Sequence, residues 1–205
     1  MTIELFLHLM NKISNIVIFA SGAGSNATNI VEYFKNNSAV VVSGICTNNP
    51  KSGVLALANQ NGIKHLVFTK NDLQKDVIVD EFLNETSPDL IVLAGFLLKF
   101  PERILKNFHN RVINLHPSLL PKYGGKGMYG IRVHEAVVEA QETLSGITIH
   151  YVNENYDDGA IIAQFSCQIQ AGDNPVHLQK KIKTLEGLYF PSTVEAVISK
   201  INTKP

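Results

Sequence analysis

The residues best suited to chemistry in this sequence are an asparagine and a histidine two positions apart, Asn114 and His116. They lie at the carboxyl end of an expected strand at 111–115, and alternation along a strand would project both to the same side. An amide beside an imidazole suits acyl transfer, because the amide can stabilise an oxyanion and the imidazole can donate or relay a proton. Taken alone, the pair more often represents a capping asparagine and a structural histidine before a loop.

A second polar segment, Ser21–Asn26, reads SGAGSN and stands between an expected strand and an expected helix. Open α/β sheets bind phosphate at such turns, since backbone N–H groups and the helix N-terminus supply partial positive charge. Ser25 and Asn26 would add side-chain donors, although either could simply cap the helix. The segment is a poor dinucleotide motif, because the second expected strand ends in Ile45-Cys46-Thr47 without the usual acidic residue. This disfavours a Rossmann oxidoreductase.

Composition narrows the classes of partner. The 205 residues include 18 basic and 18 acidic side chains, so no bulk charge attracts nucleic acid or an anionic membrane. A phosphorylated small molecule would need a local site. The two cysteines, Cys46 and Cys167, form neither a disulfide framework nor a metal-ligand pattern, and reduced thiols favour a cytoplasmic protein. We expect small-molecule partners, no metal, no nucleic acid, no membrane, and a monomer or a homodimer.

The elements that must position these residues alternate between strands and helices. Apolar runs predict strands at 15–20, 39–45, 64–68, 90–95, 111–115, 146–152 and 160–168. Helices are expected at 27–34, 54–58, 76–83, from 101, at 133–140 and from 178 to 201. This order predicts an α/β fold, a Rossmann-like open and mostly parallel sheet with helices on both faces. A short connection between the last two strands predicts an antiparallel addition before the long final helix.

The predicted domain begins after a short N-terminal segment. We expect residues 1–14 to be an extension, disordered or frayed, and residues 15–201 to form a single domain. Ile3–Met10 is rich in apolar residues but far too short to span a bilayer, and it lacks the basic start and cleavage site of a signal peptide. The regular pattern begins only at Asn15, so Met10 could be the natural start.

Four segments together resemble a known family, the phosphoribosylglycinamide formyltransferases, which are folate-dependent enzymes of purine biosynthesis. The segments are ASGAGSN at 20–26, LAGF at 93–96, NLHPSLLPKY at 114–123 and HYVNENYDDGAIIAQ at 150–164. The resemblance covers residues 15 to about 198. Its Asn-x-His-Pro run is shared by the wider group that uses formyltetrahydrofolate, so it indicates formyl chemistry more firmly than it indicates the acceptor.

The resemblance implies transfer of a formyl group from 10-formyltetrahydrofolate, a co-substrate, to the amine of glycinamide ribonucleotide. Asn114 would polarise the formyl carbonyl, and His116 would act as the general acid. Asp157 would pair with His116 or with a bridging water and would favour the protonated imidazole. The other positions that it implies are Gly24, Ser25 and Asn26 for the phosphate, Pro117 and Glu186 for the ribonucleotide, and Leu97, Leu98, Lys99, Phe100 and Asn114 for the folate.

The sequence also departs from the family pattern. The segment at 122–133, KYGGKGMYGIRV, is longer than in many members, and no catalytic residue is assigned there. Leu98 replaces a basic residue found in many members, and Asp158 replaces a small one. Context gives no role to the remaining histidines, which are His8, His65, His109, His134, His150 and His177. A formyltransferase for an amino-sugar nucleotide, a formyltetrahydrofolate hydrolase and a non-catalytic phosphate-binding module stay open as alternatives.

Overall fold

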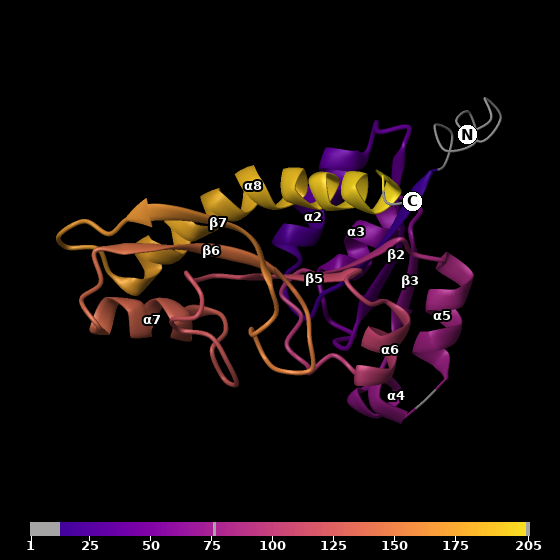
Figure 1. Ribbon diagram of the computed structural model, residues 1–205, viewed down its shortest axis with the longest axis horizontal. Coiled ribbons are helices and arrows are strands. Elements are labelled where there is room, and N and C mark those ends of the chain that lie inside the picture. Colours follow the sequence, from indigo (N-terminus) through magenta and orange to yellow (C-terminus); the bar gives the residue numbers. More distant parts are fainter. Residues whose placement is uncertain (1–12, 76, 204–205) are drawn as a thin grey trace.

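The central sheet determines where the candidate site lies. The computed structural model describes residues 13–75 and 77–203. Within these ranges seven strands form one sheet in the order β3-β2-β1-β4-β5-β6-β7 (Figure 1). The strands are β1 (Ser14–Phe19), β2 (Val40–Thr47), β3 (Lys64–Val67), β4 (Leu90–Leu93), β5 (Val112–His116), β6 (Leu144–Tyr151) and β7 (Ile161–Gln168).

Strands β1 to β5 form the parallel part of this sheet. All pairings among them are parallel, whereas β6 is antiparallel to both β5 and β7. This confirms the predicted α/β fold, a mostly parallel sheet with an antiparallel addition. The carboxyl ends of β1, β4 and β5 meet at one edge, which is where open sheets of this kind bind ligands.

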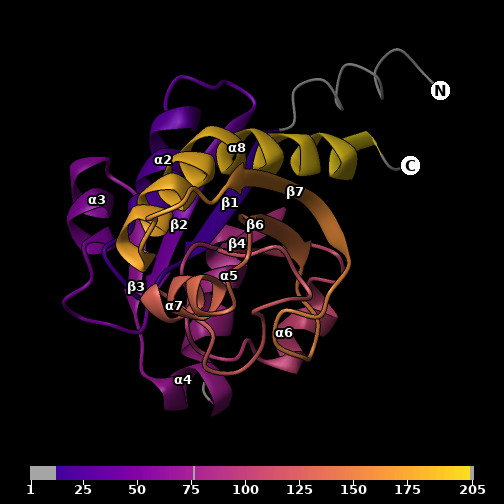
Figure 2. The same cartoon turned by 90° about the vertical axis from the view of Figure 1, so that its left-hand side faces the viewer.

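Helices cover both faces of the sheet (Figures 1 and 2). They are α2 (Ser25–Phe34), α3 (Val54–Gln60), α4 (Lys70–Lys75), α5 (Ile78–Thr86), α6 (Glu102–Asn107), α7 (Ile131–Glu139) and α8 (Pro175–Thr203). Side chains alternate along β1, so Ile16 and Ile18 enter one core while Val17 and Phe19 enter the other. The first core includes residues of α2, α3, α7 and α8, and the second includes residues of α4, α5 and α6.

Several boundaries differ from the prediction. Strand β1 begins at Ser14, which is fully buried although we expected it in the extension; residues 1–12 lie outside the described residues. Helix α4 has no counterpart among the predicted helices, because its sequence KNDLQK is too short and polar to show an apolar period. Asp76, the expected start of the next helix, lies outside the described residues, and α5 begins at Ile78. The long final helix is confirmed and starts earlier, at Pro175.

Candidate active site

Asn114 and His116 lie at the carboxyl end of β5, on the edge where open α/β sheets bind their ligands. Alternation in the strand places both on one side, as the sequence predicts. The antiparallel register of β6 sets His150 directly opposite Asn114 and Thr148 directly opposite His116. Directly opposed residues share a face of the sheet, so β6 adds its own imidazole to the site.

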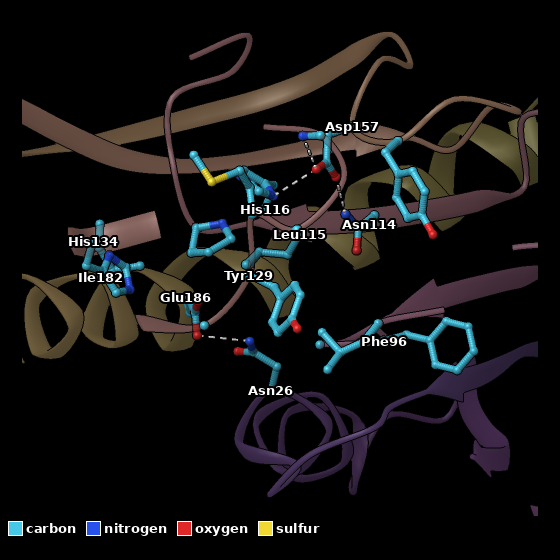
Figure 3. Close-up of a pocket in the computed structure, with 18 of the residues that line it drawn as sticks. Asn26, Phe96, Asn114, Leu115, His116, Tyr129, His134, Asp157, Ile182 and Glu186 are labelled. Carbon is cyan, nitrogen blue, oxygen red and sulfur yellow. Dashed lines mark hydrogen bonds and ion pairs between the residues drawn. The ribbon is translucent and has the colours of Figure 1, made fainter. Parts of the chain in front are cut away.

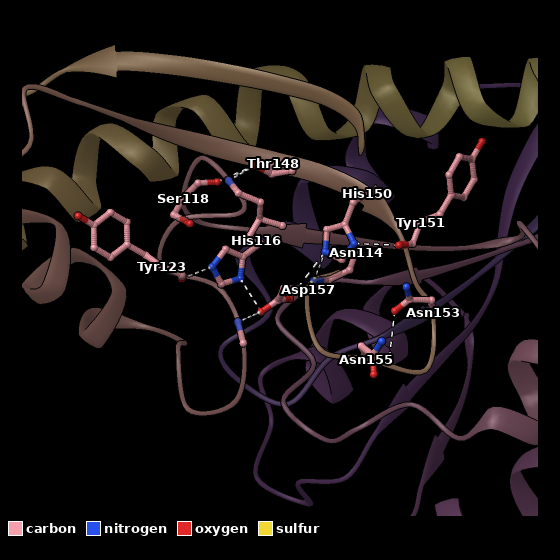
Figure 4. A network of polar contacts seen from close by, with 12 residues as sticks. Asn114, His116, Ser118, Tyr123, Thr148, His150, Tyr151, Asn153, Asn155 and Asp157 are labelled. Carbon is pink, nitrogen blue, oxygen red and sulfur yellow. Dashed lines mark hydrogen bonds and ion pairs between the residues drawn. The ribbon is translucent and has the colours of Figure 1, made fainter. Parts of the chain in front are cut away.

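The Asn114 amide is held by two neighbours (Figure 4). Nδ1 of His150 lies 2.9 Å from the backbone oxygen of Tyr151, an acceptor, so we assign the neutral imidazole its proton on Nδ1 and its lone pair on Nε2. Nδ2 of Asn114 donates to this Nε2 at 3.1 Å and to Oδ1 of Asp157 at 3.4 Å. The second bond is long, which leaves that hydrogen open to a stronger acceptor.

His116 is 3% exposed and lies between two acceptors. Its Nε2 donates to the backbone oxygen of Tyr123 at 2.8 Å, and its Nδ1 lies 3.3 Å from Oδ2 of Asp157. The same carboxylate oxygen accepts the backbone N–H of Gly125 at 2.9 Å. A second proton on His116 would therefore have an acceptor waiting, and the predicted contact between His116 and Asp157 is direct.

Burial opposes that second proton. It lowers the pKa of His116 below its ordinary value, and the charge of Asp157 and the Tyr123 carbonyl offset only part of this effect. The charge of Asp157 favours the protonated imidazole, but burial has the larger effect in the protein without substrate. Burial raises the pKa of Asp157, but contacts with His150, His116 and Gly125 outweigh it and leave that pKa lowered. At neutral pH the pair consists of an imidazole and a carboxylate.

The segment after His116 is fixed to β6. Thr148 donates from Oγ1 to the backbone oxygen of Ser118 at 2.7 Å and accepts the backbone N–H of Leu120 at 3.0 Å (Figure 4). Ser118 in turn donates to the backbone oxygen of Lys122 at 2.7 Å. These bonds determine the path of the chain up to Tyr123, whose carbonyl contacts His116.

A cavity of about 470 Å³ opens beside these residues (Figure 3). Its volume falls within the range of about 300–1,000 Å³ that is typical of sites for small molecules. Asn114, His116, Asp157 and the predicted Pro117 line it on the side of β5. The remaining lining comes from α2, α7, α8, the segment after β4, the glycine-rich segment 125–130 and Tyr156.

Asn26 and Glu186 lie across this cavity from His116 (Figure 3). Nδ2 of Asn26 donates to Oε2 of Glu186 at 2.9 Å, and both side chains are at most 9% exposed. Burial raises the pKa of Glu186, while Asn26 and the charge of Lys183 offset part of the increase. Oδ1 of Asn26 is buried and has no hydrogen-bond partner among the described residues, so a donor is missing there.

The other two residues predicted to bind phosphate stand at the start of α2. Gly24 is the N-cap, with a φ of 85°, a left-handed conformation that glycine adopts without strain. Ser25 is the first helical residue and is exposed. The first N–H groups of a helix have no intrahelical partner, and here they face the same end of the sheet as Asn26.

The residues predicted to bind folate separate into two places. Leu97 lines the larger cavity and is 48% exposed, whereas Leu98, Lys99 and Phe100 line a smaller cavity of about 60 Å³. Phe100 is 4% exposed, and its ring packs edge-on against Phe19, with centroids 5.2 Å apart, so it belongs largely to the core. The two cavities share Phe96, Asn114, Tyr156 and Asp157, so a ligand could extend from one into the other.

His134, His150 and Lys183 are among the residues that the sequence analysis left without a role and that the structure brings to the site. His150 contacts Asn114, while His134 and Lys183 line the larger cavity from α7 and α8. Only the register between β5 and β6 could have identified His150, and that register is not visible in the sequence. Lys183 stands one helical turn before Glu186, a spacing that places both on one face of α8.

Residues 13–75 and 77–203 contain no group of three or more His, Cys, Asp or Glu side chains arranged to hold a metal ion. No described helix has the length and apolar character needed to cross a membrane.

Comparison with known proteins gives consistent matches. The model of the family described as "Formyl transferase" matches residues 14–194. The chain is 39% identical over 191 residues to the chloroplastic phosphoribosylglycinamide formyltransferase of Arabidopsis thaliana, covering 89% of this chain and 64% of that protein. The corresponding protein of Vigna unguiculata is 37% identical, with 60% of its length covered. The chain therefore spans about three fifths of the length of these curated relatives.

Solved structures have the same fold. The crystal structure of phosphoribosylglycinamide formyltransferase from Bacillus halodurans superposes with a TM-score of 0.82 at 30% sequence identity. The match covers 91% of this chain and 96% of that one.

Proposed function

Because the chain belongs to the formyl transferase family, we propose that it transfers a formyl group from 10-formyltetrahydrofolate to the amine of 5'-phosphoribosylglycinamide, a step of purine biosynthesis. One observation carries this proposal: a single cavity of about 470 Å³ is lined by Asn114, His116 and Asp157 and also by Asn26 and Glu186. Groups suited to acyl transfer and groups suited to a sugar phosphate thus face one space.

Asn114 would stabilise the charge that develops on the formyl oxygen when the amine attacks. Its Nδ2 hydrogen directed at Asp157 makes only a 3.4 Å bond, so an oxyanion could take that hydrogen instead. His150 accepts the other hydrogen and keeps the amide from rotating. Oδ1 of Asn114 then points away from Asp157, as Figure 3 shows, where it could accept a hydrogen bond from the attacking amine.

His116 and Asp157 would carry the proton that the amine loses. His116 begins neutral because burial lowers its pKa, so it can accept a proton as the tetrahedral intermediate forms. The imidazolium would be stabilised by Asp157 and by the Tyr123 carbonyl. His116 would then act as the general acid, returning the proton to the folate nitrogen as its bond to the formyl carbon breaks. No step requires a covalent enzyme intermediate.

The phosphate of the acceptor would bind at the start of α2. Gly24, Ser25 and Asn26 would offer N–H and side-chain donors, and Lys183 from α8 would supply a full positive charge. Glu186 would accept hydrogen bonds from the ribose, and Pro117 would line the acceptor near the reacting centre. The unsatisfied Oδ1 of buried Asn26 supports a ligand that brings a donor to this position.

The folate would bind beside Asn114 on the side of the smaller cavity. Leu97, Leu98, Lys99 and Phe100 follow β4 and line the two connected cavities, which suits an apolar ring system with a polar edge. The small volume there, about 60 Å³, means that a pterin would also occupy the larger space that the two cavities share.

The setting of this reaction is part of the proposal. We place it in the cytoplasm, where the free thiols of Cys46 and Cys167 would stay reduced. We further propose that residues 15–201 act as one catalytic domain, as a monomer or a homodimer, without a metal or nucleic acid.

The test follows folate absorbance in purified protein incubated with 10-formyltetrahydrofolate, with and without glycinamide ribonucleotide. Release of tetrahydrofolate only in the presence of the ribonucleotide is expected. His116→Ala and Asn114→Ala should each lose at least about 10²- to 10³-fold in turnover while ribonucleotide binding survives. Release without the ribonucleotide would identify a hydrolase. No release from folded protein would leave an amino-sugar nucleotide acceptor or a binding module.

A further inference from the structure

The charge balance of the larger cavity points to a residue outside the predicted site. Among the described residues that line the cavity, the charged side chains are Lys126, Asp157, Lys183 and Glu186. Two are basic and two acidic, so the lining has no net charge. Its histidines, His116 and His134, both have lowered pKa values because of burial, and they add no positive charge at neutral pH.

Lys183 alone cannot make this cavity attractive to a phosphate dianion. Its charge acts on the buried carboxylate of Glu186, and Asp157 adds a second negative charge. Without Lys126, the lining would be net negative and would repel the phosphate. Lys126 is exposed, and no ion pair joins it to another residue in the part of the chain that the structure describes. Its charge is therefore available to a ligand.

The backbone around Lys126 is fixed to the catalytic residues. The N–H of Met128 donates to the oxygen of Gly125 at 3.1 Å, which closes a four-residue turn with Lys126 as its second residue. Gly127, the third residue, has a φ of 91°, as a type II turn requires. Gly125 also donates to Asp157. Lys126 thus stands on a short turn whose first residue is tied to the catalytic carboxylate.

Contacts of Tyr129 hold the part of the segment 125–130 that follows this turn. Tyr129 lies against the cavity in the region between Asn26 and Phe96 (Figure 3). The Arg132 guanidinium stacks over the Tyr129 ring, 5.3 Å from its centroid. The segment 125–130 therefore forms a wall of the cavity, and Lys126 is the basic residue on that wall.

We propose that Lys126 binds the phosphate of the acceptor together with Lys183 and the N-terminus of α2. The inference rests on the proposed function, since it takes a phosphorylated acceptor as given. Lys126 would then be a specificity-determining residue that favours a ribonucleotide over the same acceptor without its phosphate. Catalysis itself would not depend on it.

The experiment compares Lys126→Gln with Lys180→Gln, a matched change of an exposed lysine on α8 that does not line the cavity. Each protein is assayed with glycinamide ribonucleotide and with the corresponding riboside, and calorimetry measures ribonucleotide affinity. Lys126→Gln should lower kcat/KM for the ribonucleotide about tenfold to a hundredfold, the size expected for a charged hydrogen bond. Its kcat and its kcat/KM for the riboside should match those of Lys180→Gln.

An equal loss on both substrates would overturn the proposal, because it would mean that the substitution disturbs the wall and not a phosphate contact. Unchanged selectivity and affinity would overturn it as well. Circular dichroism and thermal melting establish that both variants fold. Failure of the proposed function is a separate result, in which the wild-type protein does not turn over the ribonucleotide at all.

Discussion

His150 is the residue on which the orientation of the Asn114 amide depends. It accepts one amide hydrogen, and its own tautomer is fixed by the carbonyl of Tyr151. His150→Ala should lower kcat about tenfold to a hundredfold, as loss of an orienting partner commonly does, with little change in KM for the ribonucleotide. His150→Gln retains an acceptor oxygen and should recover part of the rate. Steady-state kinetics that show equal loss in both variants would assign His150 to packing alone.

His134 makes a testable contribution to stability below neutral pH. Burial, followed by the charges of His116 and Lys183, lowers its pKa from 6.5 to about 4. Between these pH values His134 binds a proton in the unfolded chain but not in the folded protein. Its contribution to the free energy of unfolding is therefore fully present above pH 6.5 and decreases toward pH 4. The loss from this residue is at most about 3 kcal/mol.

Urea unfolding at pH 7.5 and at pH 4.5 measures this effect. His134→Gln cannot take up the proton in either state, so its stability should fall less between the two pH values than that of the wild-type protein. The comparison cancels the contributions of other titrating groups, including Glu186, whose raised pKa acts in the opposite sense. Equal falls in both proteins would contradict the assignment.

The turn between β6 and β7 holds Asp157 in place. Its conformation depends on close packing of the backbone at Gly159. A Cβ on Gly159 would lie 1.7 Å from the backbone oxygen of Tyr151, so the turn must move if alanine is introduced. Asp157 itself has a φ of 53°, a strained conformation that depends on this turn. Gly159→Ala should therefore lose stability and at least tenfold in kcat. In Gly187→Ala the nearest side-chain atom is 3.4 Å away, so thermal melting should show little loss.

At the scale of elements, the sequence predicts the order of strands and helices because apolar runs and their periods are local. The parallel strands, the antiparallel pair and the long final helix were all accessible in this way. Helix α4 was not, because a six-residue polar segment has no period. His150 was missed for a different reason: its role depends on which residue of β6 stands opposite Asn114, and register is decided by packing across the whole sheet.

The roles of Lys126 and Lys183 likewise could not be predicted from the sequence. A lysine in a glycine-rich segment and a lysine on an amphipathic helix both read as surface residues. They become candidates for phosphate binding only when one cavity is known to contain both, and to contain Asp157 and Glu186 as well. Local sequence patterns cannot show that these four charged residues share a cavity, because they come from three separate parts of the chain.

At the scale of the whole molecule, a hydrogen bond at the candidate site joins α2 and α8, two helices that cover one face of the sheet. Asn26 on α2 and Glu186 on α8 are 160 residues apart in sequence and form a buried hydrogen bond. The same two helices share an exposed bond, 2.7 Å from the Tyr33 hydroxyl to Glu195. Helix α2 and helix α8 thus offer a buried pair and an exposed pair for direct comparison.

Double-mutant cycles on these pairs should give different coupling energies. Asn26→Ala leaves the Glu186 carboxylate buried without its partner and should cost about 1–3 kcal/mol of unfolding free energy. Adding Glu186→Ala removes that carboxylate, so the double variant should lose less than the sum of the single losses, with a coupling of at least about 1 kcal/mol. Tyr33→Phe with Glu195→Ala should couple by less than about 0.5 kcal/mol, because water competes for exposed groups.

Urea unfolding at neutral pH provides all the free energies that these cycles need. Because Asn26 and Glu186 also line the cavity, their variants should raise KM for the ribonucleotide, whereas the Tyr33 and Glu195 variants should not. Equal coupling in the two cycles would mean that burial does not strengthen the bond between α2 and α8. In that case the two helices would be held together by the apolar core beneath them, and the alignment of Asn26 with Asn114 and His116 would depend on packing alone.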